Sequence, residues 1–252
     1  MNRYVIGIDT GGTFTDGVLL HYGTRKVVST AKSLTTRDDL KKGVIKVLKK
    51  LDIKSDYNIK LVGISSTLAT NSVAEGKARK VGLLLIGYDK DLVESYGLIE
   101  KLSTREIAFF NGGHTAQGAE AQPLDEEGIR QWVKENKDEV DAIAVSSYFS
   151  PLNSDHEEKA FKIVQECSGL PVVMAHQLST KLDSIKRAAT ASINASLVAV
   201  MQDFIQAVQY SLKDLGIEAP LMIVRGDGTL MPYTEAVRSE EHTSELQSLS
   251  HI

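Results

Sequence analysis

A short segment near the amino terminus carries more hydroxyl and carboxylate groups than a turn needs: VIGIDTGGTFTDGVLL, residues 5–20. Two apolar runs flank a polar centre with two adjacent glycines. Adjacent glycines let the backbone approach a bulky anion and present its N–H groups to it, and threonine hydroxyls add further donors. An ordinary hairpin turn with solvated threonines is the alternative, but the whole pattern favours phosphate binding. The predicted nucleotide-binding residues are Thr10, Gly11, Gly12, Thr13 and Thr15.

Two carboxylates flank this glycine turn. Asp9 ends a predicted buried strand, where it would repel a phosphate group directly. Its useful role is therefore to hold the ligand shell of a Mg²⁺ ion or to orient water. We predict Asp9 as a metal ligand, and Asp9 and Asp16 as candidate catalytic residues.

A second polar stretch is SSTLATNSVAEGK, residues 65–77. Thr67, Thr70 and Asn71 lie between a predicted strand and a predicted helix, where exposed backbone N–H groups favour an anion. Capping of that helix by Ser66 or Thr67 explains the residues equally well. Both interpretations can hold, because a capped helix terminus can still face a ligand.

His114 follows Asn111-Gly112-Gly113 in a stretch of small residues. A histidine on such a loop could bind metal or move a proton. No second histidine or cysteine lies at metal-ligand spacing, so a surface-loop role is favoured. Cys167, the one cysteine, lies on the apolar stripe of a predicted helix and is interpreted as a core residue.

The elements that must position these residues begin with three strands, at 4–9, 14–20 and 26–30, close enough in sequence to form an antiparallel meander. A helix is predicted at 38–51 from its apolar stripe. Strands then follow at 60–64, 80–86, 142–146 and 172–175, alternating with helices at 68–75, 125–135 and 154–167. This order is that of a ribonuclease-H-like α/β domain, with a mixed sheet covered on both faces.

Two details refine the later helices. Ser154 and Glu157 have the spacing of a capping box at the start of the helix at 154–167. Apolar positions from 182 to 215 predict one very long helix, or two helices broken near 192–196, with Gly216 as the carboxyl-terminal cap.

The predicted domains are a first domain at 1–178 and, at 179–237, a long helix followed by the truncated start of a second such domain. On this division the helix would leave one apolar face partly uncovered, formed by Val200, Phe204, Val208 and Leu212. Beyond it, RSEEHTSELQS from Arg238 matches the in-frame translation of a common sequencing adapter. We therefore expect 238–252 to be a non-native tail and the natural chain to continue past Val237.

Composition excludes several classes of function. The net charge of -4 and pI near 5.9 give no electrostatic footprint for nucleic acid or an anionic membrane. The longest apolar run, at 81–88, is far too short to span a membrane. No basic region followed by an apolar segment starts the chain, which predicts a cytoplasmic protein.

The motifs resemble those of a known family. GIDTGGTFTD is similar to the first phosphate loop of the actin-like ATPase and sugar-kinase superfamily. Its residues resemble those found there in the hydantoinase A/5-oxoprolinase family. The segment at 65–77 resembles the family's Ser-Thr-Thr-Leu-Ala-Thr-Asn signature, with Ser66 in place of a threonine. KRAATASINASL and VRGDGTLM, within 186–231, extend the resemblance over nearly all of 1–237.

The resemblance implies an ATP-dependent hydrolase that opens cyclic amides such as a hydantoin or 5-oxoproline, with ATP and Mg²⁺ as cofactors. It also implies a hydantoinase B-type partner subunit or domain, and it places Thr67, Thr70, Asn71 and His114 beside the substrate cleft. Related members are carboxylases of ketones. A small-molecule kinase of the same superfamily is one alternative, and a non-catalytic, ATP-binding regulatory or reactivating module is another.

In this superfamily the nucleotide lies between two related domains. A chain that holds only one side of the cleft is therefore expected to bind ATP with millimolar affinity or weaker, because half a cleft offers few contacts to offset the lost freedom of the ligand.

Overall fold

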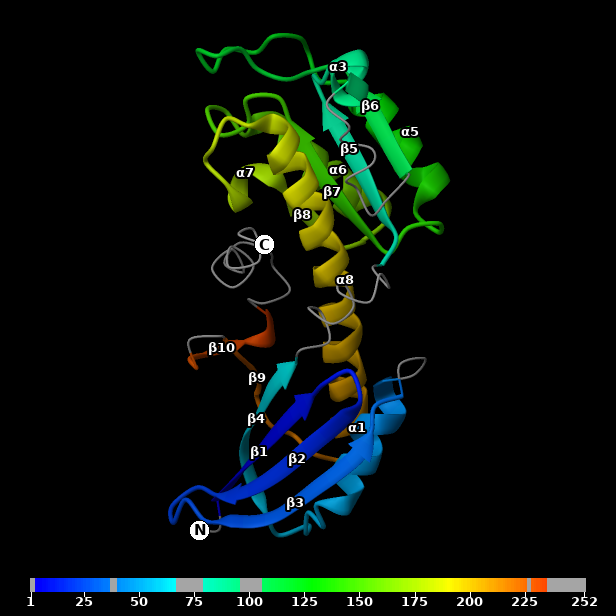
Figure 1. Ribbon diagram of the computed structural model, residues 1–252. Helices are drawn as coiled ribbons and strands as arrows, with labels where there is room; N and C mark the ends of the chain where they lie inside the picture. Colours follow the sequence, from blue (N-terminus) through cyan, green and yellow to red (C-terminus); the bar gives the residue numbers. More distant parts are fainter. Residues whose placement is uncertain (1–2, 37–39, 67–78, 96–105, 226–227, 235–252) are drawn as a thin grey trace. The chain divides into compact units, whose positions relative to one another are not determined.

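The computed structural model describes residues 3–36, 40–66, 79–95, 106–225 and 228–234. The predicted helix at 68–75 and the tail at 238–252 lie outside the described residues. The chain divides into two compact units (Figure 1). The hairpin unit contains 1–75 and 200–241. The inserted unit contains 76–199.

A six-stranded sheet forms the hairpin unit, in the order β10-β9-β4-β1-β2-β3. β1, β2 and β3 pair antiparallel, which confirms the predicted meander. β4 and β9 extend the sheet in parallel, and β10 pairs antiparallel with β9. The bounds are β1 Arg3–Thr10, β2 Phe14–His21, β3 Val27–Leu34, β4 Asn58–Ser66, β9 Leu221–Val224 and β10 Leu230–Pro232.

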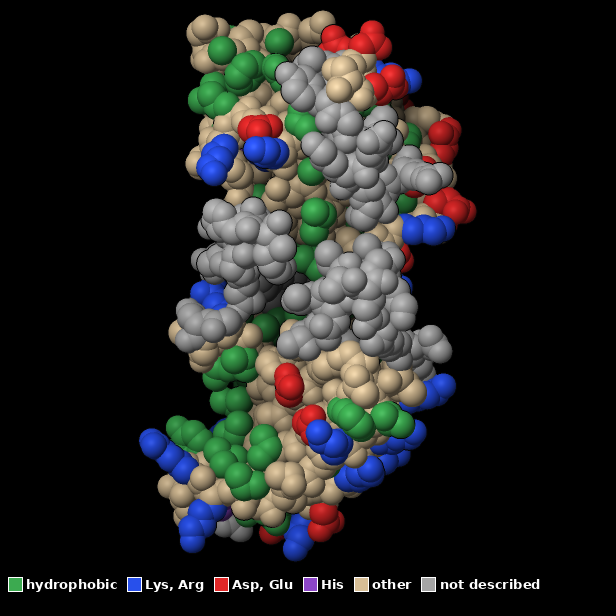
Figure 2. All heavy atoms as spheres, in the orientation of Figure 1, with side chains coloured by type: hydrophobic (Ala, Val, Ile, Leu, Met, Phe, Trp, Pro, Cys, Tyr) green, Lys and Arg blue, Asp and Glu red, His purple; other side chains and the backbone are tan. Residues whose placement is uncertain are grey.

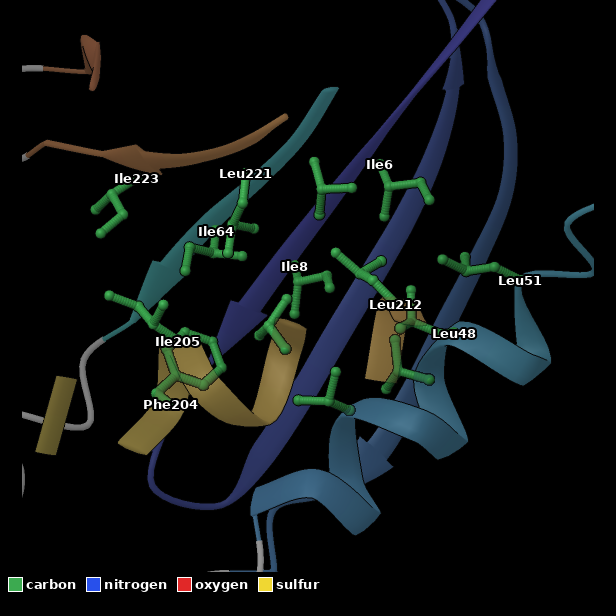
Figure 3. Packing of buried hydrophobic residues seen from close by; sticks show 14 of the residues in the cluster. Ile6, Ile8, Leu48, Leu51, Ile64, Phe204, Ile205, Leu212, Leu221 and Ile223 are labelled. Atoms are coloured by element: carbon green, nitrogen blue, oxygen red, sulfur yellow. The ribbon is translucent and has the colours of Figure 1, made fainter. Parts of the chain in front are cut away.

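The core of the hairpin unit lies on one face of this sheet. Alternate residues of β1, such as Ile6 and Ile8, are almost fully buried against α1 (Leu40–Lys50) and the later part of α8 (Ser184–Asp214) (Figure 3). The predicted apolar stripe of α1 packs here. Gly17 lets α1 lie directly on β2, because a Cβ at this position would overlap Cγ1 of Val47.

The later part of α8 belongs to this core, which differs from the predicted division of the chain at residue 178. Phe204 and Val208 have no exposed surface. The predicted uncovered face of Val200, Phe204, Val208 and Leu212 is instead packed against the first sheet. The cause is the parallel pairing of β9 with β4, which makes β9 a strand of the sheet that begins with the hairpin.

α8 is one continuous helix, so the predicted alternative of a break near 192–196 is wrong. It ends at Asp214, and Gly216, two residues later, has φ +66°. The Ile217 N–H donates to the Leu212 carbonyl at 2.9 Å, so the predicted glycine cap is confirmed. By length and composition alone α8 could cross a membrane, but 61% of its most apolar window is buried. This burial is typical of a core helix.

The inserted unit contains a separate sheet of four parallel strands in the order β6-β5-β7-β8. One face packs on α3 and the first part of α8, and the other packs on α5 and α6. The sequence predicted one mixed sheet and missed β6. The bounds are β5 Val81–Ile86, α3 Lys90–Ser95, β6 Glu106–Phe110, α5 Glu126–Asn136, β7 Ala142–Ser147, α6 Asp155–Cys167, β8 Val172–Met174 and α7 Ala175–Leu178.

The predicted capping box of α6 is wrong. Ser154 is the residue before the helix, but its side chain makes no capping hydrogen bond. Glu157 is fully buried and accepts hydrogen bonds from the backbone N–H of Ser147 at 2.7 Å and of His176 at 2.9 Å. A buried carboxylate needs several donors, and for Glu157 these come from β7 and α7 instead of the start of its own helix.

Candidate functional site

Four polar residues stand side by side across the hairpin sheet. Asp9 on β1 is the register partner of Ser65 on β4 and of Asp16 on β2, and Asp16 is in turn the partner of Lys32 on β3. Because side chains alternate along each strand, register partners face the same side of the sheet. We call Ser65, Asp9, Asp16 and Lys32 the polar row. It lies on the face opposite the helices α1 and α8.

Each carboxylate of the polar row has its own partner. The Ser65 hydroxyl donates a short hydrogen bond to the carboxylate of Asp9. Lys32 Nζ lies 3.0 Å from Asp16 Oδ1, and both side chains are substantially exposed. The two carboxylates therefore differ: among the described residues, Asp16 pairs with the cationic Lys32, whereas Asp9 pairs with the neutral hydroxyl of Ser65.

A cleft of about 620 Å³ lies over the polar row, a volume within the usual range for small-molecule sites. Its floor continues into the next row of register partners, Gly63, Gly7, Val18 and Thr30. The glycines leave this part of the sheet without side chains. Figure 2 shows acidic and basic side chains together on this face of the hairpin unit, with hydrophobic side chains on both sides of them.

The turn between β1 and β2 is braced by Thr35, a residue that the sequence analysis missed. Its hydroxyl donates to the Gly11 carbonyl at 2.9 Å, and its backbone N–H donates to the Thr13 carbonyl at 2.9 Å. A further bond of 3.0 Å joins the hydroxyls of Thr15 and Thr35. These bonds hold the glycine turn in one shape. The one available signal in the sequence was a threonine pair directly after β3.

The structure does not bring all the predicted hydroxyls to the cleft. Thr10 and Thr15 are 1% exposed and lie on the helix-facing side of the sheet, opposite to Asp9 and Asp16. Thr10 Oγ1 has no hydrogen-bond partner among the residues that the structure describes. Gly11, Gly12 and Thr13 at the turn are more accessible. Their role in binding phosphate stays a prediction, as does the role of Thr67, Thr70 and Asn71, which lie outside the described residues.

The polar row suits a magnesium ion that is shared with a phosphate group. No cluster of three or more histidine, cysteine, aspartate or glutamate residues occurs in the part of the chain that the structure describes. Mg²⁺ does not require such a cluster, because it usually takes one or two carboxylates and completes its shell with water and substrate phosphates. Asp9, a carboxylate that lines the cleft, has the chemistry of such a ligand.

His114 lies in the inserted unit and is 3% exposed, so the predicted surface-loop role is wrong. Its ring centroid lies 4.3 Å from that of His156, and in the described part of the chain Nδ1 of His114 has no hydrogen-bond partner. Burial and the neighbouring His156 both lower the pKa of His114. His156 accepts from the Gly113 N–H at Nδ1 and bonds Glu120 through Nε2, both at 2.9 Å. A role for His114 at a substrate cleft stays a prediction.

A second buried network in the inserted unit was also missed from the sequence. The guanidinium of Arg187, 2% exposed, donates to the carbonyls of Lys181 at 2.8 Å and Ser147 at 3.1 Å. The backbone N–H of Ser147 donates to Glu157, whose carboxylate also lies 2.6 Å from Nδ1 of His176. These bonds tie α6, α7 and α8 to the end of β7, so the network has a structural role.

Comparison with known proteins gives two family matches. Residues 5–168 match the model of the hydantoinase/oxoprolinase N-terminal region, and residues 187–245 match that of hydantoinase/oxoprolinase. The caprolactamase subunit alpha of Pseudomonas jessenii is 28% identical over 259 residues, which are 91% of this chain and 36% of the relative. The acetophenone carboxylase gamma subunit of Aromatoleum aromaticum is 28% identical over 261 residues, 88% of this chain and 35% of the relative. The chain thus spans about a third of the length of these relatives.

Solved structures agree with this result. A nucleotide-free acetone carboxylase matches with a TM-score of 0.70 and 17% identity, over 97% of this chain and 39% of that chain. The ATP-dependent caprolactamase from Pseudomonas jessenii matches with a TM-score of 0.64 and 26% identity, over 91% and 36%. The likeness confirms the predicted α/β fold of the actin-like ATPase class.

Proposed function

The chain belongs to the hydantoinase/oxoprolinase family, and we propose on this basis that it is the nucleotide-handling part of an ATP-dependent enzyme that opens cyclic amides. The observation that carries the proposal is the polar row. It places two carboxylates, Asp9 beside the Ser65 hydroxyl and Asp16 paired with Lys32, over an open cleft beside a braced glycine turn.

Lactams need activation before they can be opened, because their carbonyl carbon is a poor electrophile and an unstrained ring resists hydrolysis. Bound Mg·ATP supplies a phosphoryl group that makes the carbonyl oxygen a leaving group. In this proposal the glycine turn of Gly11, Gly12 and Thr13 holds the phosphates, although the Gly11 N–H itself donates to the Phe14 carbonyl at 2.9 Å, and Asp9 holds Mg²⁺. The fixed charges act by positioning and electrostatic stabilisation, the main contributions of protein groups to phosphoryl transfer.

The rest of the site comes from outside the described residues. We propose that Thr67, Thr70 and Asn71 border the substrate, and that a hydantoinase B-type subunit or domain completes the active site. Two relatives are named as subunits, alpha and gamma, which supports a partner. We further propose that the enzyme acts in the cytoplasm.

Ketone carboxylation is the second candidate, favoured by the likeness to an acetophenone carboxylase subunit. A ketone and a lactam both present a carbonyl oxygen to be phosphorylated, so the hairpin unit would act in the same way for either. The two reactions differ in the next step. Water attacks the carbonyl carbon of the activated lactam and the C–N bond breaks, whereas an activated ketone loses an α-proton and its α-carbon attacks a carbon dioxide equivalent.

Product analysis of the whole enzyme with its partner tests the proposal. With ATP and a lactam, we expect ring-opened amino acid and free phosphate in equal amounts, and neither product from an Asp9→Asn enzyme. A stable phosphorylated metabolite would instead indicate a kinase. Incorporation of labelled bicarbonate into a ketone would indicate a carboxylase, and nucleotide-dependent partner binding without turnover would indicate a regulatory module.

A further inference from the structure

The polar row contains one cationic side chain, that of Lys32, to which the proposed function assigns no role. We propose that Lys32 binds the terminal phosphoryl group of the nucleotide, and that Asp16 is a positioning residue that holds Lys32 over the cleft. This assignment rests on the proposed function, because it concerns the same nucleotide site.

Two contacts fix the position of the Lys32 ammonium. Nζ lies 3.0 Å from Asp16 Oδ1 and 4.8 Å from the centre of the Phe14 ring. Both partners are on β2, and Asp16 is the register partner of Lys32. The Lys32 side chain is nevertheless 60% exposed. The charge is therefore held over the sheet but stays open to a ligand from the cleft side.

The negative charges at the site favour a cation at the position of Lys32. Asp9 and Asp16 are both acidic, and an ATP phosphate chain adds several further negative charges, which one Mg²⁺ ion only partly offsets. Among the described residues that line the cleft, Lys32 has the one positively charged side chain. An exposed ion pair such as Lys32–Asp16 contributes little net stability, so Lys32 can contact a phosphoryl oxygen without a large loss from Asp16.

The distance from the glycine turn singles out the terminal phosphoryl group. Gly11 follows Asp9 by two residues, which is about 7 Å along a strand. A phosphate chain held at the glycine turn, where the Gly11 N–H donates to the Phe14 carbonyl, can therefore extend back over the sheet and end at the polar row. The terminal group, rather than the earlier phosphates, is then the one that meets Lys32.

Nucleotide titrations of the 252-residue chain test this assignment. Amide NMR spectra would follow binding of the magnesium complexes of ADP and of the non-hydrolysable β,γ-imido analogue of ATP, up to millimolar concentrations. We expect Lys32→Met to weaken binding of the imido analogue about tenfold or more, the loss typical of one charge-assisted hydrogen bond. Its affinity for Mg·ADP should not change.

Two further variants separate this role from a general charge effect. Lys32→Arg should keep most of the affinity for the imido analogue, because it retains the charge. Lys60→Met is the matched control, since it removes the same charge from β4 outside the lining of the cleft, and it should bind both nucleotides as the wild type does. Asp16→Asn should weaken binding of the imido analogue less than Lys32→Met does, because it loosens the ammonium without removing it.

The outcomes that would overturn the assignment are distinct. Equal affinity of Lys32→Met and wild type for the imido analogue, or an equal loss for both nucleotides, would show that Lys32 does not meet the terminal phosphoryl group. In either case the proposed function would stand. If neither nucleotide shifts the wild-type amides of Gly11 and Gly12, the nucleotide site itself is wrong and both proposals fall.

Discussion

Asp9 and Asp16 lie directly opposite each other on β1 and β2, with both carboxylates facing the same cleft. Like charges in this relationship destabilise an antiparallel pair of strands. The arrangement is tolerated here because Ser65 donates to Asp9 and Lys32 pairs with Asp16. An unfavourable pair of like charges that is offset by neighbouring polar groups is typical of a functional site.

Replacing Asp9 tests the predicted metal ligand. We expect Asp9→Asn to abolish the dependence of nucleotide binding on Mg²⁺, because the amide cannot supply the charge that the ion requires. Stability should stay within about 0.5 kcal/mol of the wild type or rise slightly, since one of two opposed carboxylates is removed. Calorimetric titration with and without Mg²⁺, together with urea unfolding, measures both effects.

Asp56→Asn is the control for this experiment, because Asp56 is exposed in the same unit and does not line the cleft. An Asp9→Asn protein that still bound nucleotide more tightly with Mg²⁺ would contradict the assignment.

Substitution of Gly17 tests the close packing of α1 on the sheet. A methyl group added there would overlap Cγ1 of Val47 and lie 3.3 Å from Cδ1 of Leu51. We expect Gly17→Ala to lower the free energy of unfolding by about 1–3 kcal/mol, the usual cost of overpacking a core. In urea unfolding, Gly23→Ala is the matched control, with its nearest neighbour 3.5 Å away. Similar midpoints for the two variants would show that α1 lies farther from β2.

Substitution of Glu157 tests the buried network of the inserted unit. Glu157→Gln keeps the shape of the side chain but loses the charge and one of the two acceptor oxygens, so either Ser147 or His176 loses its partner. We expect a loss of about 2 kcal/mol or more in the free energy of unfolding, because a buried donor without a partner is costly. Thermal unfolding should show no comparable change for Glu158→Gln, an exposed neighbour. Equal stability of the two variants would mean that Glu157 is hydrated.

His114 makes stability depend on pH. Its lowered pKa means that the fold favours the neutral ring. The resulting stability is present above the unfolded pKa of about 6.5 and is lost as the pH falls from there through the lower folded pKa. We expect the free energy of unfolding to decline over this range. His114→Gln should reduce the slope, whereas an unchanged slope would assign the decline to other groups.

Local sequence was sufficient to predict the hairpin and its acidic pair. Alternation of apolar and polar residues defined β1 and β2, and adjacent glycines marked the turn between them. Lys32 was missed because the apolar signal of the third strand fades after residue 30, whereas β3 continues to Leu34. Backbone hydrogen bonds to β2 extend that strand, and the sequence of β3 alone does not reveal them.

The sequence by itself determined most of the strands and helices and the position of the glycine turn, because these depend on neighbours within a few residues. Only the tertiary structure decided which strands share a sheet. The pairing of β9 with β4 takes residues 200–232 into the hairpin unit and leaves β5 to β8 in a sheet of their own. The tertiary structure also decided that Thr10 faces the helices, and that the ring of His114 packs beside that of His156. These relationships join residues far apart along the chain, and burial of apolar surface selects among the possible pairings only when the whole core is assembled.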